Sequence, residues 1–161
     1  MNLLITTACN LDCAYCFAGS LRKRKSPQQK RLGGREMSRA ELERAVSSLD
    51  HKVDPARLMG GEPTLHSEYP EILRFLKQRG FQVVVFTNGT QPVLHQTRPF
   101  LPDRILLNLN GRDFYAACQI QTILENLTLL GERVELGYTI TRPDFDLDWH
   151  RQLILAQGLQ P

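Results

Sequence analysis

Short apolar runs alternate along this chain with segments in which apolar residues recur every three or four positions. Five of these runs are rich in aliphatic residues and predict β-strands. The predicted strands cover residues 2–7, 56–59, 82–86, 104–109 and 133–140. The run at 82–86 is almost wholly apolar, which is expected of a strand that is buried on both faces.

The segments between these runs predict helices. One helix begins at Met37–Ser38, where Ser38 and Glu41 have the spacing of a capping box. The other predicted helices cover residues 68–78, 93–98, 113–130 and 147–157. Glycines that favour helix ends follow three of them, at Gly80, Gly131 and Gly158.

This alternation predicts an α/β protein whose parallel strands are joined by right-handed crossovers. An eight-fold barrel of about 250 residues uses roughly 31 residues for each strand–helix unit. A chain of 161 residues therefore has room for about five units, in one domain that covers residues 1–161. In such sheets the binding groups gather at the carboxyl ends of the strands.

The composition agrees with a folded domain outside the membrane. Hydrophobic residues make up 42% of the chain, which is enough for a core. No apolar run approaches the roughly 20 residues that a membrane-spanning helix needs. The first apolar run is followed within a few residues by a cysteine, unlike a signal peptide. We therefore expect a cytoplasmic location and no membrane partner.

The net charge of +3 is unevenly distributed. Seven basic residues lie between positions 22 and 35, and no acidic residue occurs from 18 to 35. Such a stretch can attract an acidic peptide, a phosphorylated substrate or RNA. No aromatic residue interleaves with it, which weakens the case for nucleic-acid stacking and favours a solvated loop.

Three cysteines near the N-terminus carry the clearest chemical signal. Cys9, Cys13 and Cys16 are separated by three and two residues in the sequence CNLDCAYC. A closed zinc site and a self-contained iron–sulfur cluster each use four ligands. Three thiolates suit three corners of a cubane cluster and leave one iron open to another ligand.

A zinc site is the alternative. Its fourth ligand would come from elsewhere in the chain, from His51, His66 or Cys118. Cys118 lies within an apolar helical pattern and is expected in the core. His66 is expected near the cysteine loop without serving as a ligand.

Four further segments follow the later predicted strands in order. They are Gly-Gly-Glu-Pro at 60–63, Thr-Asn-Gly at 87–89, Asn-Leu-Asn-Gly at 108–111 and Thr-Ile-Thr-Arg at 139–142. Together with the C-x3-C-x2-C loop and the aromatic Tyr15 before its last cysteine, this order resembles the radical S-adenosylmethionine (radical SAM) superfamily. The resemblance runs from about residue 3 to residue 142.

The resemblance implies a partial TIM-like barrel, for which the family typically uses six strand–helix units, so we expect truncation after the fifth. It implies that Cys9, Cys13 and Cys16 hold a [4Fe-4S] cluster whose open iron binds S-adenosylmethionine. Reductive cleavage of that cofactor gives a 5′-deoxyadenosyl radical that abstracts hydrogen from a substrate. The electron donor is then expected to be a flavodoxin- or ferredoxin-like protein.

The resemblance also implies contacts to S-adenosylmethionine. Residues of the Gly-Gly-Glu-Pro segment would hold the methionine amino group: Gly60, Gly61, Glu62 and Pro63. Tyr15 would pack against the adenine, and Asn108 would face the ribose hydroxyls. Arg142 would lie near the cofactor carboxylate, and Asn88 is either a cofactor contact or a turn residue. Asn110 replaces a frequent aspartate, which leaves its role open.

Two enzyme subclasses fit these motifs. One modifies peptides or proteins, and the other activates glycyl-radical enzymes; in either case a peptide or protein is the expected substrate. Two non-enzymatic alternatives stay open. One is a truncated module that binds an iron–sulfur cluster without catalysis, and the other is a zinc-binding interaction domain.

Overall fold

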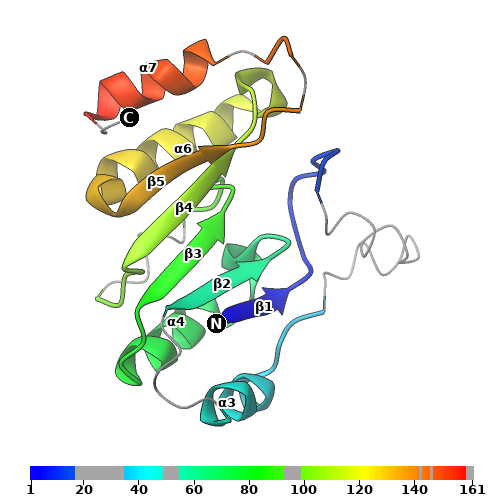
Figure 1. Cartoon of the computed structure of the whole chain (residues 1–161), viewed down its shortest axis with the longest axis vertical. Coiled ribbons are helices and arrows are strands. Elements are labelled where there is room, and N and C mark those ends of the chain that lie inside the picture. The colour runs from blue at the N-terminus through cyan, green and yellow to red at the C-terminus, as the bar shows by residue number, and fades with distance from the viewer. Residues whose placement is uncertain (17–34, 49–54, 93–98, 142, 146, 159–161) are drawn as a thin grey trace.

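The computed structural model of the chain describes residues 1–16, 35–48, 55–92, 99–141, 143–145 and 147–158. It contains one five-stranded sheet in the order β1-β2-β3-β4-β5, and every neighbouring pair is parallel (Figure 1). The strands are β1 Asn2–Thr6, β2 Ala56–Gly60, β3 Val83–Thr87, β4 Arg104–Leu109 and β5 Val134–Tyr138. The α/β prediction and all five predicted strands are confirmed, with ends that differ by one or two residues.

Helices follow the strands in the described parts of the chain. The α-helices are α3 Arg39–Ser47, α4 Tyr69–Gln78, α6 Ala117–Leu130 and α7 Asp148–Gln157. Short 3-10 helices are η1 Pro63–Leu65, η2 Arg112–Phe114 and η3 Gly131–Arg133. The helix predicted at 93–98 lies outside the described residues, as does most of the basic stretch.

Two apolar clusters support the sheet. The first joins β1, β2 and β3 to α3 and α4, and the second joins β4 and β5 to α6 and α7. In Figure 1, α3 lies toward the β1 end of the sheet, and α6 and α7 lie at the β5 end. Leu11 from the cysteine loop is 8% exposed and belongs to the second cluster. Burying such a side chain contributes about 1.5–3 kcal/mol, which fastens the loop to the sheet.

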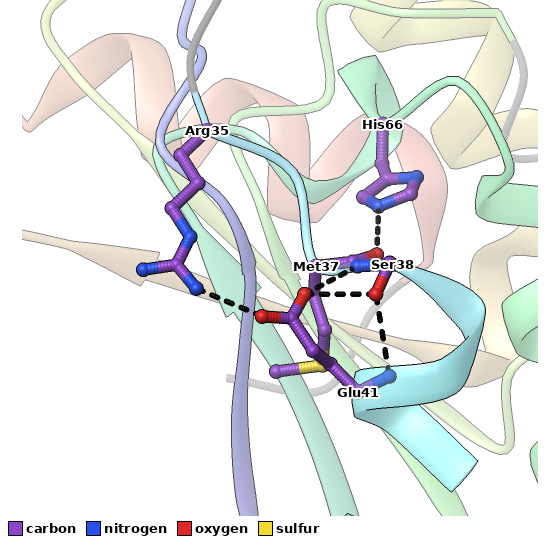
Figure 2. A network of polar contacts seen from close by, with 5 residues as sticks. All are labelled: Arg35, Met37, Ser38, Glu41 and His66. Carbon is purple, nitrogen blue, oxygen red and sulfur yellow. Dashed lines mark hydrogen bonds and ion pairs between the residues drawn. The ribbon is translucent and has the colours of Figure 1, made fainter.

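The predicted capping box at the start of α3 is confirmed. The Glu41 backbone N–H donates to the Ser38 hydroxyl, and the Glu41 carboxylate accepts from the Ser38 backbone N–H at 2.8 Å. Arg35 forms an ion pair with the same carboxylate at 2.8 Å, as Figure 2 shows. The backbone of residues 35–37 is hydrogen-bonded to β1 and to the residue after it. Met37 N–H donates to Ile5 O at 2.7 Å, and Thr7 N–H donates to Arg35 O at 3.0 Å. These contacts cover the outer edge of β1.

Two predictions for the fourth helix were wrong. The α-helix begins at Ala117 rather than at residue 113, because 112–114 form a 3-10 turn and Tyr115 has an extended backbone. This turn directs the Tyr115 ring into the second cluster, where its hydroxyl accepts a hydrogen bond from Asn110 N–H at 2.8 Å. Cys118 is exposed rather than in the core, because it lies on the side of α6 away from the buried residues Ile123, Asn126 and Leu127.

Within the described residues, no helix has the length and apolar character that crossing a membrane requires.

Candidate functional site

The predicted motifs meet at the carboxyl ends of the strands. They line one cavity of about 380 Å³, which contains all three cysteines of the N-terminal loop. The other predicted site residues on its wall are Tyr15, Gly60, Gly61, Glu62, Asn88 and Asn108. Pro63 is buried as the first residue of η1 and is not among the residues that line the cavity. Arg142 lies outside the described residues.

Cys9, Cys13 and Cys16 are half-buried and form no disulfide. Their loop is held by backbone contacts, since Cys16 N–H donates to Cys13 O at 3.1 Å and Leu11 N–H points to Cys9 Sγ at 3.5 Å. Within the described residues, no three His, Cys, Asp or Glu side chains converge tightly enough to hold one metal ion. All three thiols line the same cavity, and in an iron–sulfur cluster each cysteine binds a different iron.

The His66 side chain forms hydrogen bonds within the protein that use both of its ring nitrogens. Its Nε2 bonds to Met37 O at 3.0 Å, as Figure 2 shows, and its Nδ1 accepts from Glu68 N–H at 3.0 Å. Both ring nitrogens are therefore used, and the ring is 4% exposed. The prediction that His66 is not a ligand is consistent with this geometry, and the zinc alternative loses one of its three candidate ligands.

Two glycines let the Gly-Gly-Glu turn touch the cysteine loop. A Cβ on Gly60 would lie 2.6 Å from Thr6 O, and a Cβ on Gly61 would overlap Ala8 O and come within 2.9 Å of the Cys9 Cβ. The close approach allows two hydrogen bonds, from Gly61 N–H to Thr6 O at 2.9 Å and from Glu62 N–H to Ala8 O at 2.6 Å. These bonds fix the position of the loop relative to β2.

Glu62 is a buried carboxylate held by donors from two strand ends. Its Oε1 accepts from Thr64 N–H at 3.1 Å and from the hydroxyls of Thr64 and Thr87 at 2.5 and 2.8 Å. Its Oε2 accepts from Asn88 N–H at 2.8 Å. Burial raises the pKa of Glu62, and these donors act against that shift. No described residue supplies a cation to this carboxylate, so it suits the ammonium group of a ligand.

Asn88 takes part in a ring of side-chain hydrogen bonds. Its Nδ2 donates to Asn10 Oδ1 at 2.9 Å, Asn10 Nδ2 donates to Thr90 Oγ1 at 2.7 Å, and that hydroxyl donates to Asn88 Oδ1 at 2.7 Å. The ring ties the cysteine loop to the turn after β3. The amide of Asn88 is thus used in the turn, although Asn88 still contributes to the cavity wall.

Asn108 and Gly137 face each other across β4 and β5. They are Cα partners in the parallel register, and a Cβ on Gly137 would lie 3.5 Å from Asn108 Oδ1. The Asn108 side chain is half-buried and makes no hydrogen bond with another described residue. Its amide is therefore available to a ligand in the cavity.

Asn110 is the residue whose role the sequence left open. It is 7% exposed, it accepts the Tyr15 hydroxyl hydrogen bond on Oδ1 at 2.7 Å, and its Nδ2 donates to Cys13 Sγ at 3.4 Å. Burial, with a further contribution from Cys13, raises the pKa of Tyr15 to about 12, so its hydroxyl is a donor at neutral pH. The position of Asn110 after β4 was the available signal, but spacing alone does not predict a bond to a cysteine 97 residues away.

Comparison with known proteins defines the class to which this fold and site belong. In solved structures the chain matches TYW1 with a lysine-pyruvate adduct bound, with a TM-score of 0.63 at 17% identity over 93% of this chain and 58% of that one. A crystal structure of archaeal TYW1 matches with a TM-score of 0.53 at 17% identity, over 91% of this chain and 55% of that one. The predicted partial TIM-like barrel with parallel strands is confirmed.

The family model of the Radical SAM superfamily matches residues 3–141, so the chain belongs to this superfamily. One relative, from Methanocaldococcus jannaschii, is named "Putative glycyl-radical enzyme activating enzyme MJ1632" and is 26% identical over 90% of this chain and 58% of its own length. Another, a "Probable GTP 3',8-cyclase" of Methanococcus maripaludis, is 34% identical over 54% of this chain and 27% of its own. The chain therefore spans 58% of the first relative and about a quarter of the second.

Members of this superfamily use a [4Fe-4S] cluster and S-adenosylmethionine, and these are the cofactors of the class to which the chain belongs. The three cysteines of the loop supply the soft sulfur ligands that iron requires. The buried Glu62 carboxylate and the free Asn108 amide supply the polar groups that a zwitterionic nucleoside ligand requires. The residues present thus fit both groups.

Proposed function

We propose that this chain is the S-adenosylmethionine-cleaving core of a radical SAM enzyme, with Cys9, Cys13 and Cys16 as the cluster ligands. One observation carries the proposal most directly. Three cysteines that form no disulfide share a cavity of about 380 Å³ with a buried carboxylate that no described residue neutralises. When bound, the cluster and S-adenosylmethionine supply a 5′-deoxyadenosyl radical, and the protein supplies orientation and exclusion of water.

Each proposed cofactor contact has a structural reason. Glu62 pairs with the methionine ammonium through its Oε2, which among the described residues accepts a hydrogen bond from Asn88 N–H alone. Gly60, Gly61 and Pro63 hold the turn in place. Asn108 faces the ribose, because its amide is free and points across Gly137. Tyr15 presents its ring to the adenine, because its hydroxyl is fixed on Asn110. Two further residues belong to the proposed cofactor contacts. Asn88 acts through the turn after β3, whose N–H holds Glu62, and Arg142 is proposed to lie near the cofactor carboxylate.

The proposed substrate is a peptide or protein, as for a glycyl-radical activating enzyme. The named relative that matches 90% of this chain supports that subclass. A second cavity, of about 630 Å³, adjoins the first and shares Cys13, Tyr15, Asn110 and Thr139 with it. It is the proposed entry for the reacting segment of the substrate. The proposed electron donor is a small flavodoxin- or ferredoxin-like protein.

Cluster loading in two matched cysteine variants tests the proposal. The protein is reconstituted anaerobically with iron and sulfide, and its iron and sulfide are then determined. Cys13→Ala should abolish loading, whereas Cys118→Ala should load like the wild type, since Cys118 is exposed on α6. Equal losses in both variants would refute the three-cysteine assignment. Zinc retained without sulfide would support the zinc-binding alternative.

A further inference from the structure

The amide of Asn110 lies between the cysteine loop and the end of β4. Asn110 follows the last residue of β4 and is 7% exposed. Its Nδ2 lies 3.4 Å from Cys13 Sγ, within hydrogen-bonding distance for sulfur. We propose that Asn110 is a positioning residue that donates an N–H···S hydrogen bond to the Cys13 thiolate and thereby raises the reduction potential of the cluster. This inference rests on the proposed function, in which Cys13 is a cluster ligand.

Tyr15 determines which end of the Asn110 amide faces the sulfur. An amide oxygen only accepts hydrogen bonds, and an amide nitrogen only donates them. The Tyr15 hydroxyl donates to Asn110 Oδ1 at 2.7 Å, so the oxygen is turned toward Tyr15 and the nitrogen toward Cys13. With the amide reversed, Nδ2 would donate to the Tyr15 hydroxyl and an oxygen lone pair would face the thiolate, so only the orientation with Nδ2 toward Cys13 gives the sulfur a donor.

Tyr115 anchors the same residue from the other side. The Asn110 backbone N–H donates to the Tyr115 hydroxyl at 2.8 Å. Tyr115 is 7% exposed, and its ring lies 5.7 Å from that of Trp149, so the acceptor is fixed in the second apolar cluster. Asn110 is thus held through its backbone N–H and its side-chain oxygen, and its Nδ2, which also lies 3.5 Å from the Tyr115 hydroxyl, has a defined position.

An N–H···S bond favours the reduced cluster. Reduction adds one negative charge to the cluster and its thiolates, and a hydrogen bond to a more negative acceptor is stronger. Hydrogen bonds to the sulfurs are among the factors that set cluster potentials, and partners of ligand residues tune the metal. If the bond strengthens by enough to shift the reduction equilibrium about tenfold, the midpoint of a one-electron couple moves by about 59 mV.

The position also discriminates between asparagine and aspartate. An aspartate at position 110 would keep the Tyr15 contact but would place a carboxylate oxygen beside Cys13 Sγ. The donor would be lost and a negative charge gained, and both changes disfavour reduction. A leucine at the same position removes the donor without adding charge, so the two contributions are separable.

The test is an EPR-monitored potentiometric titration of the reconstituted 161-residue chain with dithionite and without S-adenosylmethionine. Asn110→Leu should lower the equilibrium constant for reduction about tenfold, and Asn110→Asp should lower it further. The matched controls are Asn108→Leu and Asn108→Asp, because Asn108 lines the same cavity without a hydrogen bond to a described cysteine. Asn108→Leu should change the constant less than about twofold.

The outcomes separate this inference from the proposed function. A wild-type chain that loads no cluster refutes the proposed function. If the wild type loads a cluster but each Asn110 variant has the same midpoint potential as the corresponding Asn108 variant, only the role of Asn110 is refuted. If both Asn110 variants fail to load while the Asn108 variants load, Asn110 serves cluster assembly and the tuning role is overturned.

Discussion

Replacing Gly61 by alanine tests the close contact between the Gly-Gly-Glu turn and the cysteine loop. The added Cβ would overlap Ala8 O and lie 2.9 Å from the Cys9 Cβ, whereas real Cβ contacts essentially never fall below 3.0 Å. The obstacle is backbone, so it cannot rotate away. The turn and the loop must separate, which breaks the 2.6 Å hydrogen bond from Glu62 N–H to Ala8 O.

Overpacking of this kind costs about 1–3 kcal/mol, and a lost backbone hydrogen bond adds about 1 kcal/mol. Replacing glycine by alanine also restricts the unfolded chain, which offsets about 0.4–1 kcal/mol. We therefore expect Gly61→Ala to lower the free energy of unfolding by about 2 kcal/mol. With a slope of about 2 kcal/mol per molar urea, the unfolding midpoint falls by about 1 M. Because Cys9 moves with the loop, the iron content after reconstitution should fall as well.

Gly111→Ala is the matched control at the same edge of the sheet. A Cβ on Gly111 would meet nothing within 4 Å, and its backbone has a negative φ of −59°. This variant should unfold at or slightly above the wild-type urea concentration and should load iron normally. If Gly61→Ala had the urea midpoint and iron content of Gly111→Ala, the proposed contact between turn and loop would be refuted.

Three further predictions concern Glu62, Asp103 and Asn126. Glu62→Gln should keep its iron but raise the dissociation constant for S-adenosylmethionine at least about tenfold, because the ammonium loses its charged partner; anaerobic equilibrium dialysis showing unchanged affinity would exclude Glu62 from the site. Although burial acts in the opposite direction, the hydrogen bond from Lys77 and that from Val83 N–H lower the pKa of Asp103. The stability from this carboxylate is therefore present above its unfolded pKa of about 3.9 and is lost as the pH falls through the lower folded pKa. Urea midpoints measured from neutral to acidic pH should fall less steeply for Asp103→Asn than for the wild type, and parallel curves would contradict this. Asn126 is fully buried and donates to Gly89 O and Gln91 O at 2.9 and 3.0 Å. Asn126→Leu should cost about 1–3 kcal/mol in urea unfolding because two carbonyls lose a donor, and an unchanged midpoint would show that they find other partners.

Local patterns accounted for the elements and for most of the cavity wall. Aliphatic runs predicted the strands because a parallel sheet buries both faces, and the Ser38–Glu41 pair predicted a cap because both partners lie within one turn. The carboxyl ends of parallel strands share one edge, so motifs scattered along the sequence were expected to meet there. The cavity at that edge follows from this topology.

What the sequence did not predict depends on contacts between distant residues. The bond between Asn110 and Cys13 spans 97 positions, and its direction depends on Tyr15. Likewise, the helical pattern extends back to residue 113, but burial of the Tyr115 ring favours an extended backbone there and delays the helix start. The exposure of Cys118 follows from its place on the side of α6 away from the buried residues.

Release of 5′-deoxyadenosine from S-adenosylmethionine tests the central claim most directly. The reconstituted chain is reduced with dithionite under anaerobic conditions, and the products are separated by chromatography. We predict 5′-deoxyadenosine and methionine in the wild type and neither above background in Cys13→Ala. A fully loaded and reduced cluster that binds S-adenosylmethionine without releasing 5′-deoxyadenosine would contradict the claim that this chain is a cleavage-competent core, and would indicate a non-catalytic cluster-binding module.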